Sequence, residues 1–406
     1  MPGERSMRDV LHNLLQYGDL SFRDFVELVL YHPEFGYYAR PENPVGKAGD
    51  YVTAPTLSPV FSFAIGKLVR EFMSRSEGEV CSIVDIGCGD GGLIEALAGD
   101  EVARFPGIPV SRQEAEGDAV ARSRGEAKEA EHRETAKPRN RETAYFGVDR
   151  NLRRVTGQPG NRATFVNTLD EVPGNGPHLF LSNELFDALP FARLVQRGEH
   201  LHELWVAERD GTFDWTEHEA PPQYEEYFAA RGISLADGQF ADVSLEWDAY
   251  YADVARFAER ALIVTIDYGF EQRKLFHPRI RRFGTAAAYS AQRVSRDLLA
   301  DPGEQDLTAH INFTDLERAG EREGASTLFF DSLAKFLLAL GITEHELFRP
   351  VHELEAASAE EGMSLLEARD EARRLVLPDG IGEDLRVLVQ AKGLPVEGWS
   401  FQRILF

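Results

Sequence analysis

The sequence has very few cysteines: Cys81 and Cys88 are the only two among 406 residues. Two cysteines cannot form the set of disulfides that stabilises small secreted domains, and their spacing matches no metal-ligand motif. We therefore expect free thiols in a reducing compartment, and we interpret the chain as a cytoplasmic protein.

Long hydrophobic runs are absent as well. No uncharged apolar stretch approaches the roughly 18 residues that are needed to span a bilayer. The first residues include acidic side chains and lack both the apolar segment of a secretory signal and the composition of a transit peptide. These features agree with a cytoplasmic location and predict no membrane partner.

Basic residues are scarce, with 44 Lys and Arg against 68 Asp and Glu and a formal net charge of -24. Nucleic acids and anionic lipids are bound mainly through Lys and Arg, so neither is expected as a partner. A basic or arginine-presenting partner protein fits this charge better. The alternative is that the excess of acidic residues only keeps the protein soluble. The oligomeric state is left open.

Apolar residues are abundant, since 43% of the chain is hydrophobic and 10% is aromatic. This suffices for one large core with an accessory lobe, or for two domains. Up to residue 78 the pattern is helical and turn-rich, with a helix over 20–30 that is expected to begin at a Ser21 cap. Strands then alternate with helices, which predicts an α/β, Rossmann-like fold with a mainly parallel sheet. The expected strands are 81–86, 144–149, 163–167, 178–182, 261–267 and 385–389.

Two segments interrupt this alternation. Residues 101–143 contain almost no large apolar side chains after Val110, so they cannot bury enough surface to become ordered and are predicted to be a mobile insertion. Residues 191–217 alternate apolar and polar side chains, which indicates β-hairpins appended to the sheet. Further helices are expected over 244–260, 314–324, 330–340 and 353–375.

A glycine-rich turn follows the first expected strand. Gly87, Gly89 and Gly92 satisfy the pattern GxGxxG, which is weak by itself and suits NAD equally well. Dinucleotide sites have small apolar residues before the first glycine, whereas Asp85 offers a carboxylate that suits a cationic cofactor such as S-adenosylmethionine. When the insertion is left out, Asp149 follows the turn by about 20 residues, where a ribose-binding carboxylate belongs.

An amide and two carboxylates, Asn183, Glu184 and Asp187, follow the strand expected at 178–182. Ligands of open α/β sheets bind outside the carboxyl ends of the strands. In a helical turn Glu184 and Asp187 would share a face, and paired carboxylates suit the planar fork of a guanidinium. The alternative is that Asp187 only caps the following turn.

The chain resembles the MidA-like S-adenosylmethionine-dependent methyltransferases, a family that includes the mitochondrial complex I assembly arginine methyltransferase. The matching segments are 20–22, 31–38, 49–55, 85–91, 183–190, 266–269, 284–285 and 306–310. The resemblance implies a class I methyltransferase fold with a seven-stranded sheet and a helical lobe, S-adenosyl-L-methionine as the cofactor, and an arginine of a partner protein as the acceptor. The chain departs from the family at Asp85, where Glu is usual, after Tyr289, where a His often follows, and near Leu333, where a Gln is missing; these departures concern the acceptor more than the cofactor.

Pattern and resemblance together assign the site residues. Glu184 and Asp187 are expected to hold the acceptor, with Asn183 orienting cofactor or acceptor. The expected cofactor-binding residues are Asp50, Thr53, Asp85, Gly87, Gly89, Asp149, Asn167 and Asn183. On the acceptor side the resemblance adds Asp267, Tyr268 and His310. Purely structural roles stay open for Asp50, for Asn167 as a turn residue, and for His310.

We accordingly divide the chain into three parts: 1–78, a helical and loop region that closes over the cofactor; 79–270, the methyltransferase core with the insertion and the hairpin; and 271–406, an acceptor-side lobe. Two other function classes stay open, an NAD-linked oxidoreductase and a non-catalytic assembly factor, as does a small-molecule acceptor. His200 and His202 face one side of a strand, but no third ligand lies near them in the sequence, so no metal site is expected.

Overall fold

The structure is a computed structural model that describes residues 6–40, 58–99, 143–152, 155, 162–291, 293–350, 352 and 359–403. Asp50, Thr53 and the insertion expected at 101–143, except for Thr143 at its end, lie outside the described residues.

The larger sheet contains seven strands in the order β15-β16-β10-β5-β2-β3-β4, and the short strand β14 extends it beside the end of β10. Strands β2, β3, β4, β5 and β10 are parallel, whereas β16 is antiparallel to both of its neighbours. The mainly parallel sheet predicted from the sequence is confirmed. The bounds are β2 Ser82–Ile86, β3 Ala144–Val148, β4 Ala163–Val166, β5 His178–Asn183, β10 Ala261–Phe270, β14 Ile311–Asn312, β15 Ser326–Ser332 and β16 Leu385–Lys392.

Helices cover both faces of this sheet, because the central strands are apolar on both sides. In β2, Val84 and Ile86 belong to one buried cluster and Ile83 to the other. The first cluster packs under α8 and α10, and the second packs under α4, α5 and α11. The bounds are α4 Pro59–Arg75, α5 Gly92–Ala98, α8 Trp247–Phe257, α10 Phe313–Arg322 and α11 Leu333–Ala339.

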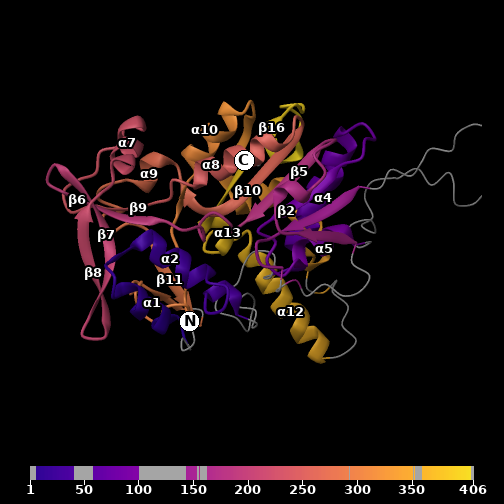
Figure 1. The fold of residues 1–406 in the computed structure, drawn as a ribbon. Helices are drawn as coiled ribbons and strands as arrows, with labels where there is room; N and C mark the ends of the chain where they lie inside the picture. Colours follow the sequence, from indigo (N-terminus) through magenta and orange to yellow (C-terminus); the bar gives the residue numbers. More distant parts are fainter. Residues whose placement is uncertain are drawn as a thin grey trace, which may run out of the picture.

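A smaller antiparallel sheet lies beside the larger one (Figure 1) and includes the predicted hairpins. Strand β7 pairs with β6, β8 and β1, and β6 pairs with β9. Helix α7 Pro222–Ala230 and the short helix α9 Gln272–Leu275 belong to the same side of the molecule (Figure 1). The strands are β1 Leu20–Ser21, β6 Ala192–Arg197, β7 His200–Arg209, β8 Thr212–Glu219 and β9 Phe240–Val243.

The N-terminal helices α1 Met7–Leu15 and α2 Phe22–Tyr31 pack on this smaller sheet. The hydroxyl of Ser21 accepts the N–H of Asp24, so the predicted helix cap is confirmed. The ring of Phe22 contacts those of Phe191 and Trp215, which joins α2 to the hairpins.

One element differs in type from its prediction. A helix was expected over 330–340, but β15 runs to Ser332 and α11 begins only at Leu333. Strand β15 covers the edge of β16, and its register shifts between Thr327 and Phe329. This bulge breaks the two-residue period of the strand, and the boundary lies at Ser332, whose hydroxyl accepts the N–H of Lys335 and caps α11.

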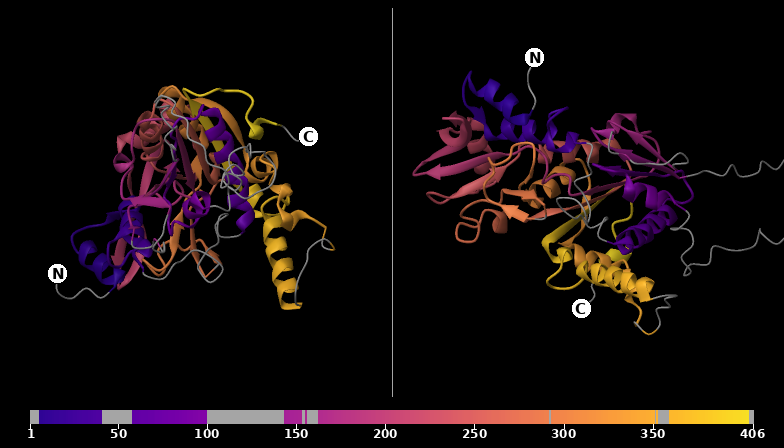
Figure 2. Two further views of the ribbon diagram at one scale, coloured as in Figure 1. Left: turned by 90° about the vertical axis from the view of Figure 1, so that its right-hand side faces the viewer. Right: turned by 90° about the horizontal axis from the view of Figure 1, so that it is seen from below.

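The remaining elements are a three-stranded sheet of β11 Ala287–Ser290, β12 Arg293–Ser295 and β13 Asp306–Thr308, the helix α12 Ala359–Arg374 and the short helix α13 Ile381–Asp384. Helix α12 extends away from the body of the molecule (Figure 2). Within the described ranges, no helix combines the length and apolar composition of a membrane crossing. The division of the chain at residues 78 and 270 stays a proposal.

Candidate functional site

A cavity of about 660 Å³ lies at the carboxyl ends of β2, β3, β4 and β5. The connection after β2 runs to β3, and β5 lies on the other side of β2, so the cavity is at the switch point of the sheet. Predicted residues from four separate segments meet in its wall: Asp85, Gly87, Gly89, Asp149, Asn167, Asn183 and Glu184.

The glycine turn forms one wall, and its geometry depends on the backbone freedom of glycine. Gly87 and Gly89 have φ of 74° and 58°. A side chain at Gly87 would collide with Leu185, since its Cβ would lie 2.7 Å from Leu185 Cδ1. The turn therefore packs directly on the segment that follows β5.

Asp149 joins the glycine turn to the end of β3. Its Oδ2 accepts the N–H of Gly89 at 3.0 Å, and its Oδ1 accepts the N–H of Asn151 at 2.8 Å. The side chain of Asn167 donates to the backbone oxygen of Asp149 at 3.2 Å.

Asp85 is buried beneath the turn, with 3% of its surface exposed. Its burial, together with the neighbouring carboxylates of Asp149 and Asp90, raises the pKa of Asp85 to about 8. No described residue bonds to its carboxyl group. An environment of three carboxylates favours a bound cation and repels a pyrophosphate, which argues against the NAD alternative.

Asn183 ends β5 and faces the cavity. Its Nδ2 donates to Glu184 Oε1 at 3.0 Å, whereas its Oδ1 is buried and accepts no hydrogen bond from the described residues. A buried acceptor without a donor is costly, so this oxygen fits a ligand that donates a hydrogen bond.

The loop 184–190 is a bend and a turn, and the helical turn that would put Glu184 and Asp187 on one face is absent. Glu184 has φ of 52°, in the left-handed region that is unfavourable for a residue with a side chain. Strain of this kind persists only where the surroundings impose it, and it is concentrated at functional sites.

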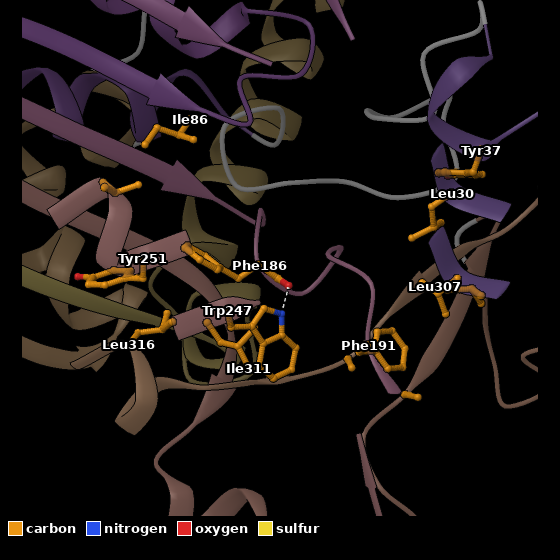
Figure 3. Close-up of a cluster of buried hydrophobic side chains, with 14 of the residues drawn as sticks. Leu30, Tyr37, Ile86, Phe186, Phe191, Trp247, Tyr251, Leu307, Ile311 and Leu316 are labelled. Atoms are coloured by element: carbon orange, nitrogen blue, oxygen red, sulfur yellow. Dashed lines mark hydrogen bonds between the residues drawn. The ribbon is translucent and has the colours of Figure 1, made fainter. Parts of the chain in front are cut away.

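Side chains from two helices hold this loop in place. Trp247 of α8 donates to the backbone oxygen of Phe186 at 2.7 Å, and Figure 3 shows this bond within the buried cluster. Tyr31 of α2 donates its hydroxyl to the backbone oxygen of Ala188 at 2.8 Å. The position of Glu184 is therefore determined by helices on both sides of the cavity.

Asp187 and Asp267 form a buried pair behind Glu184, and neither residue lines the cavity. Burial and the neighbouring Asp267 raise the pKa of Asp187 well above its ordinary value. Burial raises the pKa of Asp267 to about 7, although backbone N–H groups and Asp187 bond to it and oppose this rise. Both shifts favour the protonated form of the pair, and the rise is larger for Asp187 because Asp267 is stabilised in its ionised form by these hydrogen bonds.

Tyr268 and His310 lie beyond this pair, with ring centroids 6.2 Å apart in a stacked arrangement. Burial is the main cause that lowers the pKa of His310 to about 4, so the ring is neutral near neutral pH. Its Nδ1 is buried and has no partner among the described residues. Burial and the nearby Glu184 and Asp187 raise the pKa of Tyr268.

The sequence interpretation missed the aromatic part of the cavity wall. Tyr31 and Tyr250 line it, and the guanidinium of Arg150 lies 4.2 Å from the Tyr31 ring centroid. Tyr31 belongs to a segment that resembles the family, which was the available signal, whereas Tyr250 lies on α8 and no motif marks it.

Comparisons with known proteins agree with this geometry. The model of the family described as "Putative S-adenosyl-L-methionine-dependent methyltransferase" matches residues 114–330, which include β3, β4, β5, β10 and the loop of Glu184. The protein arginine methyltransferase NDUFAF7, mitochondrial, of Danio rerio is 24% identical over 332 residues, which are 78% of this chain and 72% of that protein. Its Drosophila melanogaster homologue is 24% identical over 77% of this chain and 69% of its own length.

Among solved structures, a Burkholderia thailandensis protein bound to S-adenosyl-homocysteine superposes with a TM-score of 0.77. It is 23% identical, and the match covers 98% of this chain and 94% of the other. A second, native structure from the same organism gives a TM-score of 0.74 at 24% identity over 98% of this chain and 93% of the other. These likenesses confirm the predicted fold class.

The cytoplasmic location that we predicted is wrong, because the curated relatives are named as mitochondrial proteins. The prediction relied on the composition of the first residues and on a low cysteine count, which separates disulfide-forming compartments from reducing ones. It does not distinguish one reducing compartment from another.

Proposed function

The chain belongs to the family of S-adenosyl-L-methionine-dependent methyltransferases, whose model matches more than half of it, and we propose that it methylates an arginine side chain of a partner protein. Two properties support this acceptor. The curated relatives are named protein arginine methyltransferases, and a carboxylate, Glu184, lies on the cavity wall next to a buried pair of acids.

The cavity suits the cofactor of the family. Its volume lies within the usual range for small-molecule sites, and two of its polar groups, the Asp85 carboxyl and Asn183 Oδ1, have no partner in the described chain. When bound, S-adenosylmethionine supplies an electrophilic methyl group on a sulfonium. We assign its ammonium to Asp85 and its ribose hydroxyls to Asp149, with the adenine beside Asn167.

Glu184 is the residue that we assign to the guanidinium. A guanidinium stays charged at neutral pH and presents its donors as a planar fork, which a carboxylate can hold in a fixed orientation. The nitrogen must also lose a proton as it becomes methylated, and an ionised carboxylate can accept that proton. Holding the acceptor in line with the methyl group would supply much of the rate.

For Asp187 we propose a role other than the acceptor binding that its spacing from Glu184 suggested. Because it is buried and does not line the cavity, we propose that Asp187 and Asp267 are positioning residues. They fix the loop that carries Glu184, and a proton held by the pair limits the negative charge beside it. Tyr268 and His310 then form the wall on the acceptor side.

The test is transfer of labelled methyl from S-adenosylmethionine to lysate proteins, followed by hydrolysis and separation of methylated amino acids. We expect label in methylarginine. Glu184→Gln should lower this transfer at least about 100-fold while binding of S-adenosyl-homocysteine stays within about twofold. The matched control is Glu77→Gln, since Glu77 is exposed and has a similar φ of 54°.

The alternatives give other results. Label in a different amino acid, or only in small molecules, would exclude arginine as the acceptor. A protein that binds S-adenosyl-homocysteine but labels nothing, and whose partners still assemble with the Glu184→Gln variant, would be the non-catalytic assembly factor.

A further inference from the structure

Four cationic side chains from separate elements gather beyond the acceptor side of the site. Three of them surround the ring of Phe270 at the end of β10: Lys274 Nζ lies 4.2 Å, Arg281 Cζ 4.6 Å and Arg386 Cζ 5.7 Å from its centroid. Arg296 is near enough to act electrostatically on Arg281. We call Lys274, Arg281, Arg296 and Arg386 the cationic cluster.

The cationic cluster is not neutralised by the described part of the chain. The four side chains form no ion pair there with an acidic residue, and those of Arg296 and Arg386 bond only to backbone oxygens. The Nε of Arg281 is buried without any partner. In a chain with a net charge of -24, uncompensated cations this close together indicate a place for an anion.

The directions of the pKa shifts in the cluster agree with this geometry. Burial, followed by repulsion from Arg386 and Arg281, lowers the pKa of Lys274, and Glu271 opposes this only weakly. Burial and repulsion from Arg296 lower the pKa of Arg281. The cluster thus carries an electrostatic cost that a bound anion would relieve.

Aromatic rings connect the cluster to the proposed acceptor site. The ring of His310 lies 5.5 Å from that of Phe270 and 6.2 Å from that of Tyr268. Tyr268 in turn lies within electrostatic range of Glu184 and Asp187. The acceptor side therefore has acids at one end and cations at the other.

We propose that the cationic cluster is a subsite for a carboxylate of the acceptor protein, which it binds while the arginine of that protein occupies the acid end. This rests on the proposed function and adds a sequence preference to it. The path from the Tyr268 ring over His310 and Phe270 to Lys274 adds up to about 16 Å, which an extended chain covers in roughly five residues. The enzyme would thus prefer an arginine with an acidic residue within about five positions.

The experiment measures binding of fluorescent peptides to the full chain with S-adenosyl-homocysteine present. Each peptide carries one arginine and either Glu or Gln at three, four or five positions from it, on either side. We expect one Glu position to strengthen binding about tenfold over Gln, as suits a hydrogen-bonded ion pair. Lys274→Gln and Arg281→Gln should abolish this difference without changing the affinity of the Gln peptide.

The matched control is Arg273→Gln. Arg273 is exposed and adjoins Lys274 on α9, but it does not lie over Phe270, so the variant loses the same charge in nearly the same place. It should keep the Glu preference. Lys274 is itself exposed, so Lys274→Gln still decides the question if Arg281→Gln does not fold.

Two results would overturn the proposal: no position at which Glu is preferred over Gln, or an equal loss in Arg273→Gln and Lys274→Gln. Inorganic phosphate that displaces the Glu and Gln peptides alike would also overturn it, since it would show a site for free anions. Replacing the arginine by norleucine separates the two proposals, because a Glu preference that survives this change supports the subsite even if arginine is not the acceptor.

Discussion

The Oδ2 of Asp267 accepts a hydrogen bond from the backbone N–H of Phe186 at 2.8 Å, so β10 holds the loop that begins with Glu184. Asp267 also accepts the N–H of Tyr268 at 2.8 Å through Oδ1 and a hydrogen bond from Asp187. One buried carboxylate therefore sets the positions of the acceptor loop and of the acceptor-side tyrosine together.

The two members of the acid pair should respond differently to amidation. Asp187→Asn keeps a donor toward Asp267 and should change the free energy of unfolding by about 1 kcal/mol or less. In Asp267→Asn the amide nitrogen cannot accept the hydrogen bonds that the second carboxylate oxygen accepts. This variant should therefore lower the free energy of unfolding by about 2–4 kcal/mol. Urea unfolding measures both, and equal losses would contradict the assignment of the proton to Asp187.

Glu184→Gly should stabilise the protein while it abolishes methyl transfer. Glycine adopts the left-handed backbone conformation without strain, and the substitution removes a negative charge beside the buried acids. These two gains in stability should exceed the cost of glycine's greater conformational freedom in the unfolded chain by about 1 kcal/mol. Thermal unfolding with Glu77→Gly as the control checks this. A lower Tm for Glu184→Gly alone would mean that its side chain supports the fold.

Cofactor binding should strengthen as the pH rises toward 8. Burial and the neighbouring carboxylates raise the pKa of Asp85 to about 8, and a bound ammonium requires its ionised form, so binding releases a proton below that pH. The association constant of S-adenosyl-homocysteine should rise by up to about tenfold per pH unit between about pH 6 and 8. Titration calorimetry in buffers of different ionisation enthalpy measures the proton, and a profile that is flat with pH would contradict the assignment.

Asp85→Asn should raise the stability of the cofactor-free protein, and more so at high pH. The folded pKa of Asp85 lies above its unfolded value, so its contribution to stability is present at low pH and is lost as the pH rises toward 8. The variant lacks this loss, so its Tm should exceed that of the natural chain by several degrees at about pH 8 and by little at about pH 4. Added S-adenosyl-homocysteine should not stabilise the variant further.

The sequence predicted those elements whose pattern is local. Strands such as β5 and β10 were found because they are buried on both faces and form continuous apolar runs. Strand β15 was mistaken for the start of a helix because a bulge interrupts its alternation. Pairing between distant segments, such as β1 with β7, left no local signal.

For the site residues, spacing along the sequence predicted less well than position in the sheet which side chains lie close together. Asp85 and Asp149 were paired correctly because the turn and the second strand are neighbours in any βαβ unit, and the structure brings them together. Asp187 was placed on the cavity because only its distance from Glu184 was visible. Its true partner, Asp267, and the cationic cluster come from segments that meet only in the folded molecule.

The close approach of Gly87 to Leu185 changes how the glycine motif should be understood. Its first glycine has no room for a side chain because Leu185, which lines the same cavity, occupies the space where a Cβ would lie. A mutational scan that assigned every glycine of the turn to the cofactor would therefore misattribute this one. A methyl group at Gly87 would displace Leu185, the residue next to Glu184, so a substitution in the glycine turn should also disturb the loop that follows β5.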